Sequence, residues 1–184
     1  MMDTQTDPVL AVAFNRAVDD FADPLKNFAF RLVKDPGLAE DVAQEAFLAL
    51  FRHLHAVPPQ AFKPWLFRVA RNLCLDHLRR LKHKQVLFRD LSGDDDQPIL
   101  PPEKGNNRPD EVAQQHEMQR AVELAIEELP TKFREVFLMC ELEGLSYEEV
   151  ATALNIPVKT VSTRLFRARV RFKRMIDKHL RVAS

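Results

Sequence analysis

Residues 158–171 of this 184-residue chain combine Lys and Arg with Ser and Thr at a spacing that suits contact with nucleic acid. Cationic side chains bind phosphate, and hydroxyl, amide and guanidinium groups can reach base edges in the major groove. From Lys159 to Arg181 the chain has nine Lys or Arg residues and one acid, Asp177. The predicted DNA contacts are Lys159, Thr160, Ser162, Thr163, Arg164, Arg167 and Arg171.

A helix-turn-helix over residues 145–174 would hold these side chains in place. Ser146 and Glu149 have the spacing of a capping box, which predicts the start of a short helix. Asn155 tolerates the left-handed conformation of a tight turn, and Pro157 suits the first turn of a second helix. That second helix has apolar residues at steps of three and four, which predicts one buried face: Val158, Val161, Leu165, Ala168, Phe172 and Met175.

Residues 62–80 form a second basic segment, in which aromatic side chains are interleaved. Cations follow a phosphate backbone and aromatic rings stack on unpaired bases, so this mixture favours single-stranded or opened DNA. The candidate contacts are Phe62, Trp65, Arg68, Arg71, Asn72, Arg79 and Arg80. Taken singly, an aromatic residue such as Trp65 or Phe67 is more often part of a core. Both interpretations stay open for the aromatic residues.

Residues 38–54 predict an amphipathic helix with Val42, Ala46 and Leu50 on its buried side. Phe47, Leu48 and Phe51 make the apolar surface wider than one contact face requires. Burial on two sides would explain this width, and so would a surface offered to another protein; burial is favoured by the pattern alone.

Composition favours an all-α protein with two small helical domains joined by a flexible acidic linker, the C-terminal domain being a helix-turn-helix. There are only four glycines and one tyrosine, and runs of alternating β-branched residues are few. The predicted domains are residues 9–87 and 118–180, each with its own core, and the linker is 88–117. The linker is rich in Pro and acidic residues, which break helical and strand periodicity. The two cysteines, Cys74 and Cys140, do not predict a disulfide framework.

The chain resembles the bacterial RNA polymerase sigma factors, specifically the small extracytoplasmic-function (ECF) type. Three stretches carry the resemblance: AEDVAQEAFLALF (39–51), FKPWLFRVARNLCLDHLRR (62–80) and the segment from Glu128 to Arg169. They are similar to the family's core-polymerase-binding helix, its segment that recognises and melts the −10 element, and its −35-binding domain. Their order, with a linker between the second and third, makes the resemblance specific.

The resemblance implies a role for each stretch. Asp41, Gln44, Glu45 and Phe47 are expected to face the clamp of the polymerase β′ subunit, and the polymerase β subunit and promoter DNA are further expected partners. The 62–80 set is expected to recognise and melt the −10 element, and the 158–171 set to read the −35 element. An anti-sigma factor is an expected partner. No cofactor, metal, small-molecule substrate or direct membrane insertion is expected, and the protein is expected in the cytoplasm, with the nucleoid when bound to polymerase.

Two other classes of function remain as alternatives. A stand-alone helix-turn-helix transcriptional regulator would not need the basic, aromatic segment 62–80, and would usually add a dimer interface or ligand pocket. An enzyme could use the histidines and Cys74, but HExxH, paired CxxC, P-loop and GxSxG motifs are all missing from the sequence. His53 and His55 point apart at their spacing on a helix, which disfavours a metal site.

Overall fold

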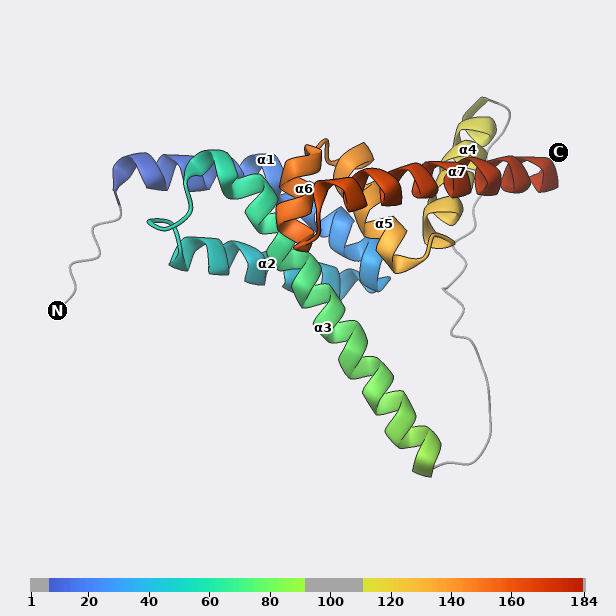
Figure 1. Ribbon diagram of the computed structural model, residues 1–184, viewed down its shortest axis with the longest axis horizontal. Helices are drawn as coiled ribbons and strands as arrows, with labels where there is room; N and C mark the ends of the chain where they lie inside the picture. The colour runs from blue at the N-terminus through green and yellow to red at the C-terminus, as the bar shows by residue number, and fades with distance from the viewer. Residues whose placement is uncertain (1–6, 92–110, 184) are drawn as a thin grey trace.

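A computed structural model of the chain describes residues 7–91 and 111–183. These residues form helices and connecting turns, with no strand among them. In chain order the elements are α1 (Pro8–Val33), α2 (Pro36–Arg52), the 3₁₀ turn η1 (Pro59–Ala61), α3 (Phe62–Leu91), α4 (Glu111–Glu127), α5 (Thr131–Phe137), the π-helical turn η2 (Leu138–Leu142), α6 (Tyr147–Leu154) and α7 (Val158–Ala183) (Figure 1). The predicted all-α class is confirmed.

Acidic residues and prolines define where α1 and α2 begin. The Asp7 side chain accepts a hydrogen bond from the Val9 amide at 2.9 Å, and Pro8 follows within the first turn of α1. α2 starts in the same way, with Asp35 accepting from Leu38. A proline costs little at such a position because the first amides of a helix have no helical partner. α1 also runs continuously through Pro24, although a proline inside a helix removes one backbone hydrogen bond.

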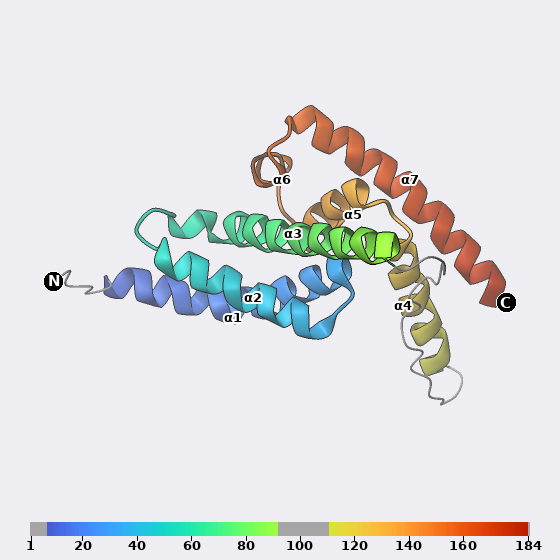
Figure 2. The ribbon, with the colours of Figure 1, turned by 90° about the horizontal axis from the view of Figure 1, so that it is seen from below.

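Helices α1, α2 and α3 form the N-terminal unit. α1 and α2 lie side by side, and α3 crosses them and extends beyond the rest of the molecule (Figures 1 and 2). Their contact surface is apolar and fully buried: Leu25, Phe28, Leu50, Leu66 and Phe67 are 0% exposed. The Phe28 and Phe67 rings meet edge to face with centroids 5.2 Å apart. This packing fixes which sides of α2 and α3 remain at the surface.

Helices α4 to α7 form the C-terminal unit, in which α6 and α7 are the two helices of a helix-turn-helix. Ser146 and Glu149 make both hydrogen bonds of the capping box, with the Ser146 amide donating to Glu149 at 2.8 Å. Asn155 has φ 52°, the left-handed turn conformation that the sequence predicts. Val161, Leu165 and Ala168 of α7 are buried, whereas Val158, which the periodicity places in the core, is 41% exposed.

A π-helical turn joins α5 to the turn before α6. The Glu143 amide donates to the Leu138 carbonyl at 3.0 Å, five residues back instead of the four of an α-helix. Leu138 and Met139 in this turn are buried. The turn therefore presents two large apolar side chains to the interior just before the helix-turn-helix begins.

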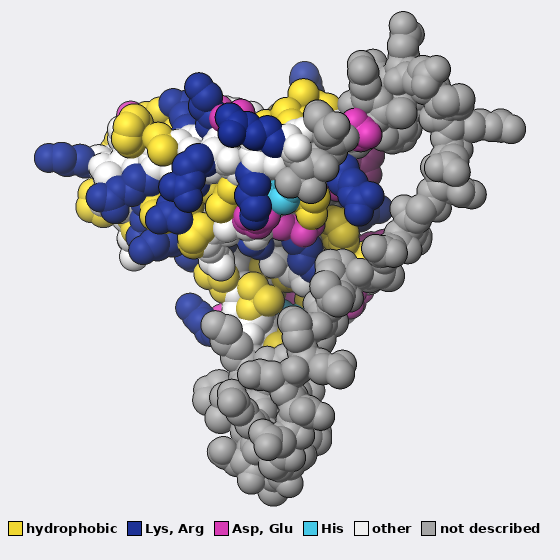
Figure 3. Space-filling model, turned by 90° about the vertical axis from the view of Figure 1, so that its right-hand side faces the viewer, with side chains coloured by type: hydrophobic (Ala, Val, Ile, Leu, Met, Phe, Trp, Pro, Cys, Tyr) yellow, Lys and Arg dark blue, Asp and Glu magenta, His cyan; other side chains and the backbone are white. Residues whose placement is uncertain are grey.

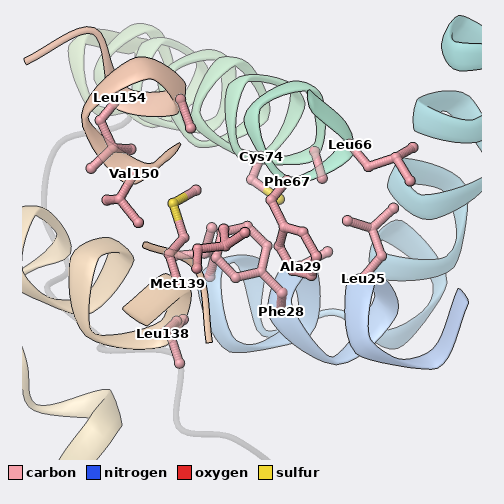
Figure 4. Packing of buried hydrophobic residues seen from close by; sticks show 14 of the residues in the cluster. Leu25, Phe28, Ala29, Leu66, Phe67, Cys74, Leu138, Met139, Val150 and Leu154 are labelled. Carbon is pink, nitrogen blue, oxygen red and sulfur yellow. The ribbon is translucent and has the colours of Figure 1, made fainter. Parts of the chain in front are cut away.

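The two units pack against each other. α3 contacts α6 and α1 contacts α5, so buried residues of both units form one continuous cluster. Figure 4 shows Leu138, Met139, Val150 and Leu154 on one side of this cluster, with residues of α1 and α3 on the other. This differs from the two separate cores that the sequence predicts. Apolar residues of α1 and α3 meet those of α5 and α6 across the seam between the units.

The predicted linker falls between α3 and α4. Its first residues, 88–91, continue α3, and its last, 111–117, begin α4. Residues 92–110 lie outside the described part of the chain. The domain limits of 9–87 and 118–180 therefore remain a proposal, and α3 and α4 each extend past the limit proposed for them.

Candidate nucleic-acid interface

The N-terminal half of α7 carries all but one of the residues that are predicted to contact the −35 element. Lys159, Thr160, Thr163, Arg164 and Arg167 line a shallow hollow together with Lys132, Phe133 and Pro157. Ser162 is exposed but is not among the residues that line this hollow. The structure therefore brings together five side chains of the predicted set on one side of α7.

Lys132 and Phe133 of α5 also line the hollow, although the sequence patterns did not single them out. The Arg171 guanidinium carbon and the Lys132 ammonium nitrogen each lie 5.2 Å from the centroid of the Phe133 ring. A cation over an aromatic face is attracted to it and loses some of its freedom. The arrangement holds Arg171 beside the hollow. The run Thr131-Lys132-Phe133 has no helical period that links it to α7, so only the fold reveals this proximity.

Thr163 has a hydrogen-bond partner and Arg164 an ion-pair partner within the protein. The Thr163 hydroxyl donates to the Lys159 carbonyl at 2.9 Å, which leaves its oxygen lone pairs to accept from a base amino group. Arg164 is 27% exposed at its side chain and pairs with Glu135 at 3.6 Å. Arg167 and Lys159 are exposed. The hollow thus offers hydroxyl acceptors and cations together, as a major-groove surface requires.

Basic side chains also continue along α7 beyond the hollow. Arg169, Lys173, Arg174 and Arg181 are all exposed, and Lys and Arg side chains gather over the face shown in Figure 3. Arg169 is held by Glu141, which accepts from its Nε at 3.0 Å, and this hydrogen bond raises the pKa of Arg169. Such a surface attracts phosphate without reading sequence.

The predicted contacts on α3 are more buried than those on α7. Phe62 is 2% exposed and lies in the core, so its predicted contact with DNA is wrong in this structure, because the ring packs inside the protein. Trp65 is half-buried, with its ring centroid 5.9 Å from that of His53. Arg68 is also half-buried. Of the aromatic residues in this segment, Trp65 keeps part of its ring at the surface and Phe67 does not.

Asn72, Arg79 and Arg80 are the exposed members of the α3 set. The Asn72 carbonyl oxygen accepts from Arg71 at 3.2 Å, which leaves the amide NH₂ group to donate. Arg79 pairs with Asp76 at 2.9 Å on the exposed side of α3. Arg71 differs, because its Nε donates to Glu135 of the C-terminal unit at 2.9 Å. Arg71, a predicted DNA contact of α3, is therefore paired with the C-terminal unit where the two units meet.

The predicted polymerase-binding residues lie on α2. Asp41, Gln44 and Glu45 are exposed, and Phe47 is half-buried with its ring 6.4 Å from that of Phe14. Next to them is an apolar groove between α1 and α2 of about 690 Å³. Leu48 and Phe51 line it and are 55% and 52% exposed. Of the two explanations for the wide apolar surface of this segment, the structure supports an exposed face.

The two cysteine thiols are partly or fully buried. Burial raises the pKa of Cys74 to about 12 and that of Cys140 to about 11, which disfavours the reactive thiolate. Among the described residues, no three His, Cys, Asp or Glu side chains form a group that could hold a metal ion. In the same part of the chain, no helix has the length and apolar character to cross a membrane.

Two protein-family models match the chain. Sigma-70 region 2 matches residues 17–84, which cover most of the N-terminal unit, and Sigma-70, region 4 matches residues 119–172, which contain the helix-turn-helix. The first model includes α2 and the exposed part of α3, and the second includes the hollow on α7. The candidate surfaces on α2, α3 and α7 thus all fall inside matched regions.

Curated relatives match over most of their length. The chain is 33% identical over 151 residues to the ECF RNA polymerase sigma factor SigM of Bacillus subtilis, covering 82% of this chain and 87% of SigM. It is 34% identical over 176 residues to the RNA polymerase sigma-H factor of Pseudomonas aeruginosa, covering 93% and 90%.

Two solved structures share the fold. One is the sigma factor RpoE of Bartonella quintana, solved with the anti-sigma factor NepR, with a TM-score of 0.67, 22% identity and coverage of 89% of this chain and 96% of that one. The other is CnrH in complex with the cytosolic domain of CnrY, with a TM-score of 0.63, 25% identity and coverage of 92% and 96%.

Proposed function

The chain belongs to the ECF family of RNA polymerase sigma factors, and from this premise we propose how its surfaces divide the work of promoter recognition. A sigma factor directs RNA polymerase to promoters, so this chain acts with core polymerase and promoter DNA rather than as a stand-alone regulator. The proposal assigns three surfaces: the hollow on α7, the exposed side of α3, and the α2 face beside the apolar groove.

The hollow on α7 reads the −35 element. The observation that carries this assignment is the exposed, basic and hydroxyl-rich N-terminal half of α7, placed directly after the capped α6 and the Asn155 turn. A recognition helix presents its N-terminal residues to base edges in the major groove. Lys159, Thr160, Ser162, Thr163, Arg164 and Arg167 contact bases, and Lys132 and Arg171 contact the phosphate backbone.

The exposed side of α3 captures the −10 element. Asn72 supplies an amide that can donate and accept, Trp65 supplies a partly exposed ring, and Arg68, Arg79 and Arg80 supply cations for phosphate. Unpairing costs a few kcal/mol for each extruded base and is offset by stacking and by hydrogen bonds to the exposed edge. Phe62 has no part in this surface, because it is buried.

The α2 face binds core polymerase. Its exposed acids and amide, Asp41, Gln44 and Glu45, lie next to the apolar residues Leu48 and Phe51. Apolar patches with a polar rim are typical of protein-binding surfaces. The double variant Asp41→Lys/Glu45→Lys should lose affinity for core polymerase, whereas Glu117→Lys, an exposed change on α4, should not. Equal affinity for the two variants would remove the assignment.

Transcription in vitro tests the whole proposal. Core polymerase with this chain should produce transcripts from promoters that core polymerase alone ignores, and the α7 variants should fail in a way that depends on the −35 sequence. A chain that neither binds core polymerase nor directs transcription would contradict the proposal, and a stable dimer that binds operator DNA alone would favour the stand-alone regulator.

We also infer control by an anti-sigma factor, because two proteins of the same fold are solved with protein partners, NepR and the cytosolic domain of CnrY. Such a partner would cover the polymerase-binding and DNA-binding surfaces. The protein would work in the cytoplasm with polymerase and would have no catalytic activity of its own. Copurification from native cells checks for the partner, and activity that follows only the abundance of this chain would argue against it.

A further inference from the structure

Trp65, in the first turns of α3, is the only tryptophan of the chain and is half-buried. Among the described residues it pairs with one other ring, the imidazole of His53. The two ring centroids are 5.9 Å apart and the ring planes are tilted by 42°. Aromatic rings attract each other at centroid distances of about 4.5–7 Å. His53 belongs to none of the three surfaces assigned above, so this contact has no role in the proposed function so far.

Hydrogen bonds fix both the backbone and the ring of His53, which is the C-cap of α2. Its amide donates to the Leu50 carbonyl at 2.9 Å, and its carbonyl accepts from the amides of Ala56 and Val57 at 2.8 and 3.0 Å. Its Nδ1 lies 2.8 Å from the Ala49 carbonyl oxygen, to which a protonated Nδ1 donates. The side chain is exposed, so these hydrogen bonds rather than burial hold the imidazole in place.

Trp65 lies on the side of α3 that is proposed to capture the −10 element. Arg68 and Asn72 follow it at steps of three and seven residues, which places all three on one side of a helix. An aromatic ring stacks on an unpaired base in only a few orientations, and a free indole at a surface loses side-chain entropy when it stacks. A neighbour that orders the ring beforehand reduces this cost.

We propose that His53 is a positioning residue for promoter opening: its imidazole holds the indole of Trp65 in one orientation, ready to stack on a base of the melted −10 element. The role belongs to the aromatic ring of His53 and not to its place at the end of α2. His53 acts through Trp65 and needs no contact with DNA of its own. The inference rests on the proposed role of α3 in capturing the −10 element.

Two substitutions separate the ring of His53 from its place at the helix end. His53→Asn removes the ring and keeps a residue that suits a helix C-terminus. His53→Phe keeps a ring and removes the donor to the Ala49 carbonyl. The matched control is His55→Asn, the same chemical change at an exposed histidine that forms no ring pair within the described residues. Circular dichroism checks that all three variants keep the helical fold.

Time-resolved fluorescence anisotropy of the full chain reports the motion of Trp65 alone, because the chain has no other tryptophan. The indole should move more freely in His53→Asn, and as in the wild type in His53→Phe and His55→Asn. The second measurement uses core polymerase and a promoter that the wild-type chain opens. An aromatic pair favours one orientation by about 3- to 10-fold, so His53→Asn should slow open-complex formation by about that factor. The other two variants should stay within about twofold of the wild type.

A double-mutant cycle with Trp65→Ala gives the decisive result. If His53 acts through Trp65, adding His53→Asn to Trp65→Ala should slow opening no further. Additive losses would overturn the proposal, as would equal rates for His53→Asn and His53→Phe or an unchanged motion of Trp65 in His53→Asn. A wild-type chain that fails to direct transcription contradicts the proposed function instead, and the fluorescence then still decides whether His53 orders Trp65.

Discussion

Helices α3 and α7 are both long and rich in arginine, yet they present their basic residues in different ways. α3 packs against α1, α2 and α6, and between Phe62 and Leu81 most of its side chains are buried or half-buried. α7 contacts α4, α5 and α6 along a single buried stripe, so both flanks of that stripe stay exposed. Composition indicates affinity for nucleic acid in both helices, but the burial of each side chain against its neighbours decides which of them are available.

The aromatic residues of the two helices also differ in their burial. Phe67 of α3 is 0% exposed and packs on Phe28, whereas Phe166 of α7 is 67% exposed. Phe67→Ala should therefore cost about 3–5 kcal/mol of unfolding free energy, because it leaves a cavity in the core that joins the two units. Phe166→Ala should stay within about 0.5 kcal/mol of the wild type. Urea unfolding followed by circular dichroism measures both, and similar losses would break the comparison.

Substitutions of individual α7 arginines should differ in whether the loss of DNA binding depends on the promoter sequence. Arg164→Ala or Arg167→Ala should cost about 1–3 kcal/mol, mainly at one promoter position, if the side chain reads a guanine. Arg171→Ala should weaken binding on all sequences, because Arg171 lies over Phe133 at the side of the hollow. Transcription from single-base promoter variants separates the two patterns, and equal loss on every variant would make Arg164 and Arg167 phosphate contacts.

For α3, the corresponding test is Asn72→Ala. Loss of the amide should leave polymerase binding and closed-complex formation nearly unchanged and slow open-complex formation by about tenfold, the equivalent of one hydrogen bond to an extruded base. A promoter with a pre-opened −10 region should recover most of the activity. Permanganate footprinting on linear and pre-opened templates reports the effect, and equal failure on both would show that Asn72 has a structural role.

On its own, the chain should bind duplex promoter DNA weakly and with little sequence preference. The two surfaces act together only when polymerase holds them at a fixed spacing, and Glu135 forms ion pairs with Arg71 of one surface and Arg164 of the other. Gel shifts at physiological salt measure this, and tight sequence-specific binding by the isolated chain would contradict it.

Removal of a local cap should have the smallest effect. Ser146→Ala removes one of the two hydrogen bonds of the capping box and should cost about 1 kcal/mol. The position of α6 should survive, because Val150 and Leu154 remain buried against the cluster. Urea unfolding and DNA binding measure the two quantities. A large loss of DNA binding would mean that the cap, rather than burial, sets the position of α7.

Local signals in the sequence were enough to predict the helix-turn-helix, whereas the family was inferred from the resemblance of three stretches to its known segments. Ser146, Glu149 and Asn155 specify a cap and a turn through their own backbones, so no distant contact is needed to interpret them. Glu135 shows where such reasoning ends. A glutamate near two Lys or Arg residues is normally a solvated surface residue, and its burial depends on Arg71, which is 64 residues away in the chain. The packing of the two units against each other could not be predicted from the sequence for the same reason, because it depends on residues that are far apart in the chain.

The π-helical turn at Leu138–Leu142 bears on how this chain can change in length. A π turn holds one more residue than an α turn, so everything after it is rotated by about 100° relative to an uninterrupted helix. Deletion of a single residue here, for example Cys140, would let the segment relax into regular α-helix, but would turn Leu145 and the start of α6 away from their present packing. We therefore expect this turn not to tolerate the insertion or deletion of a single residue. A substitution keeps the length of the turn and should be tolerated more easily.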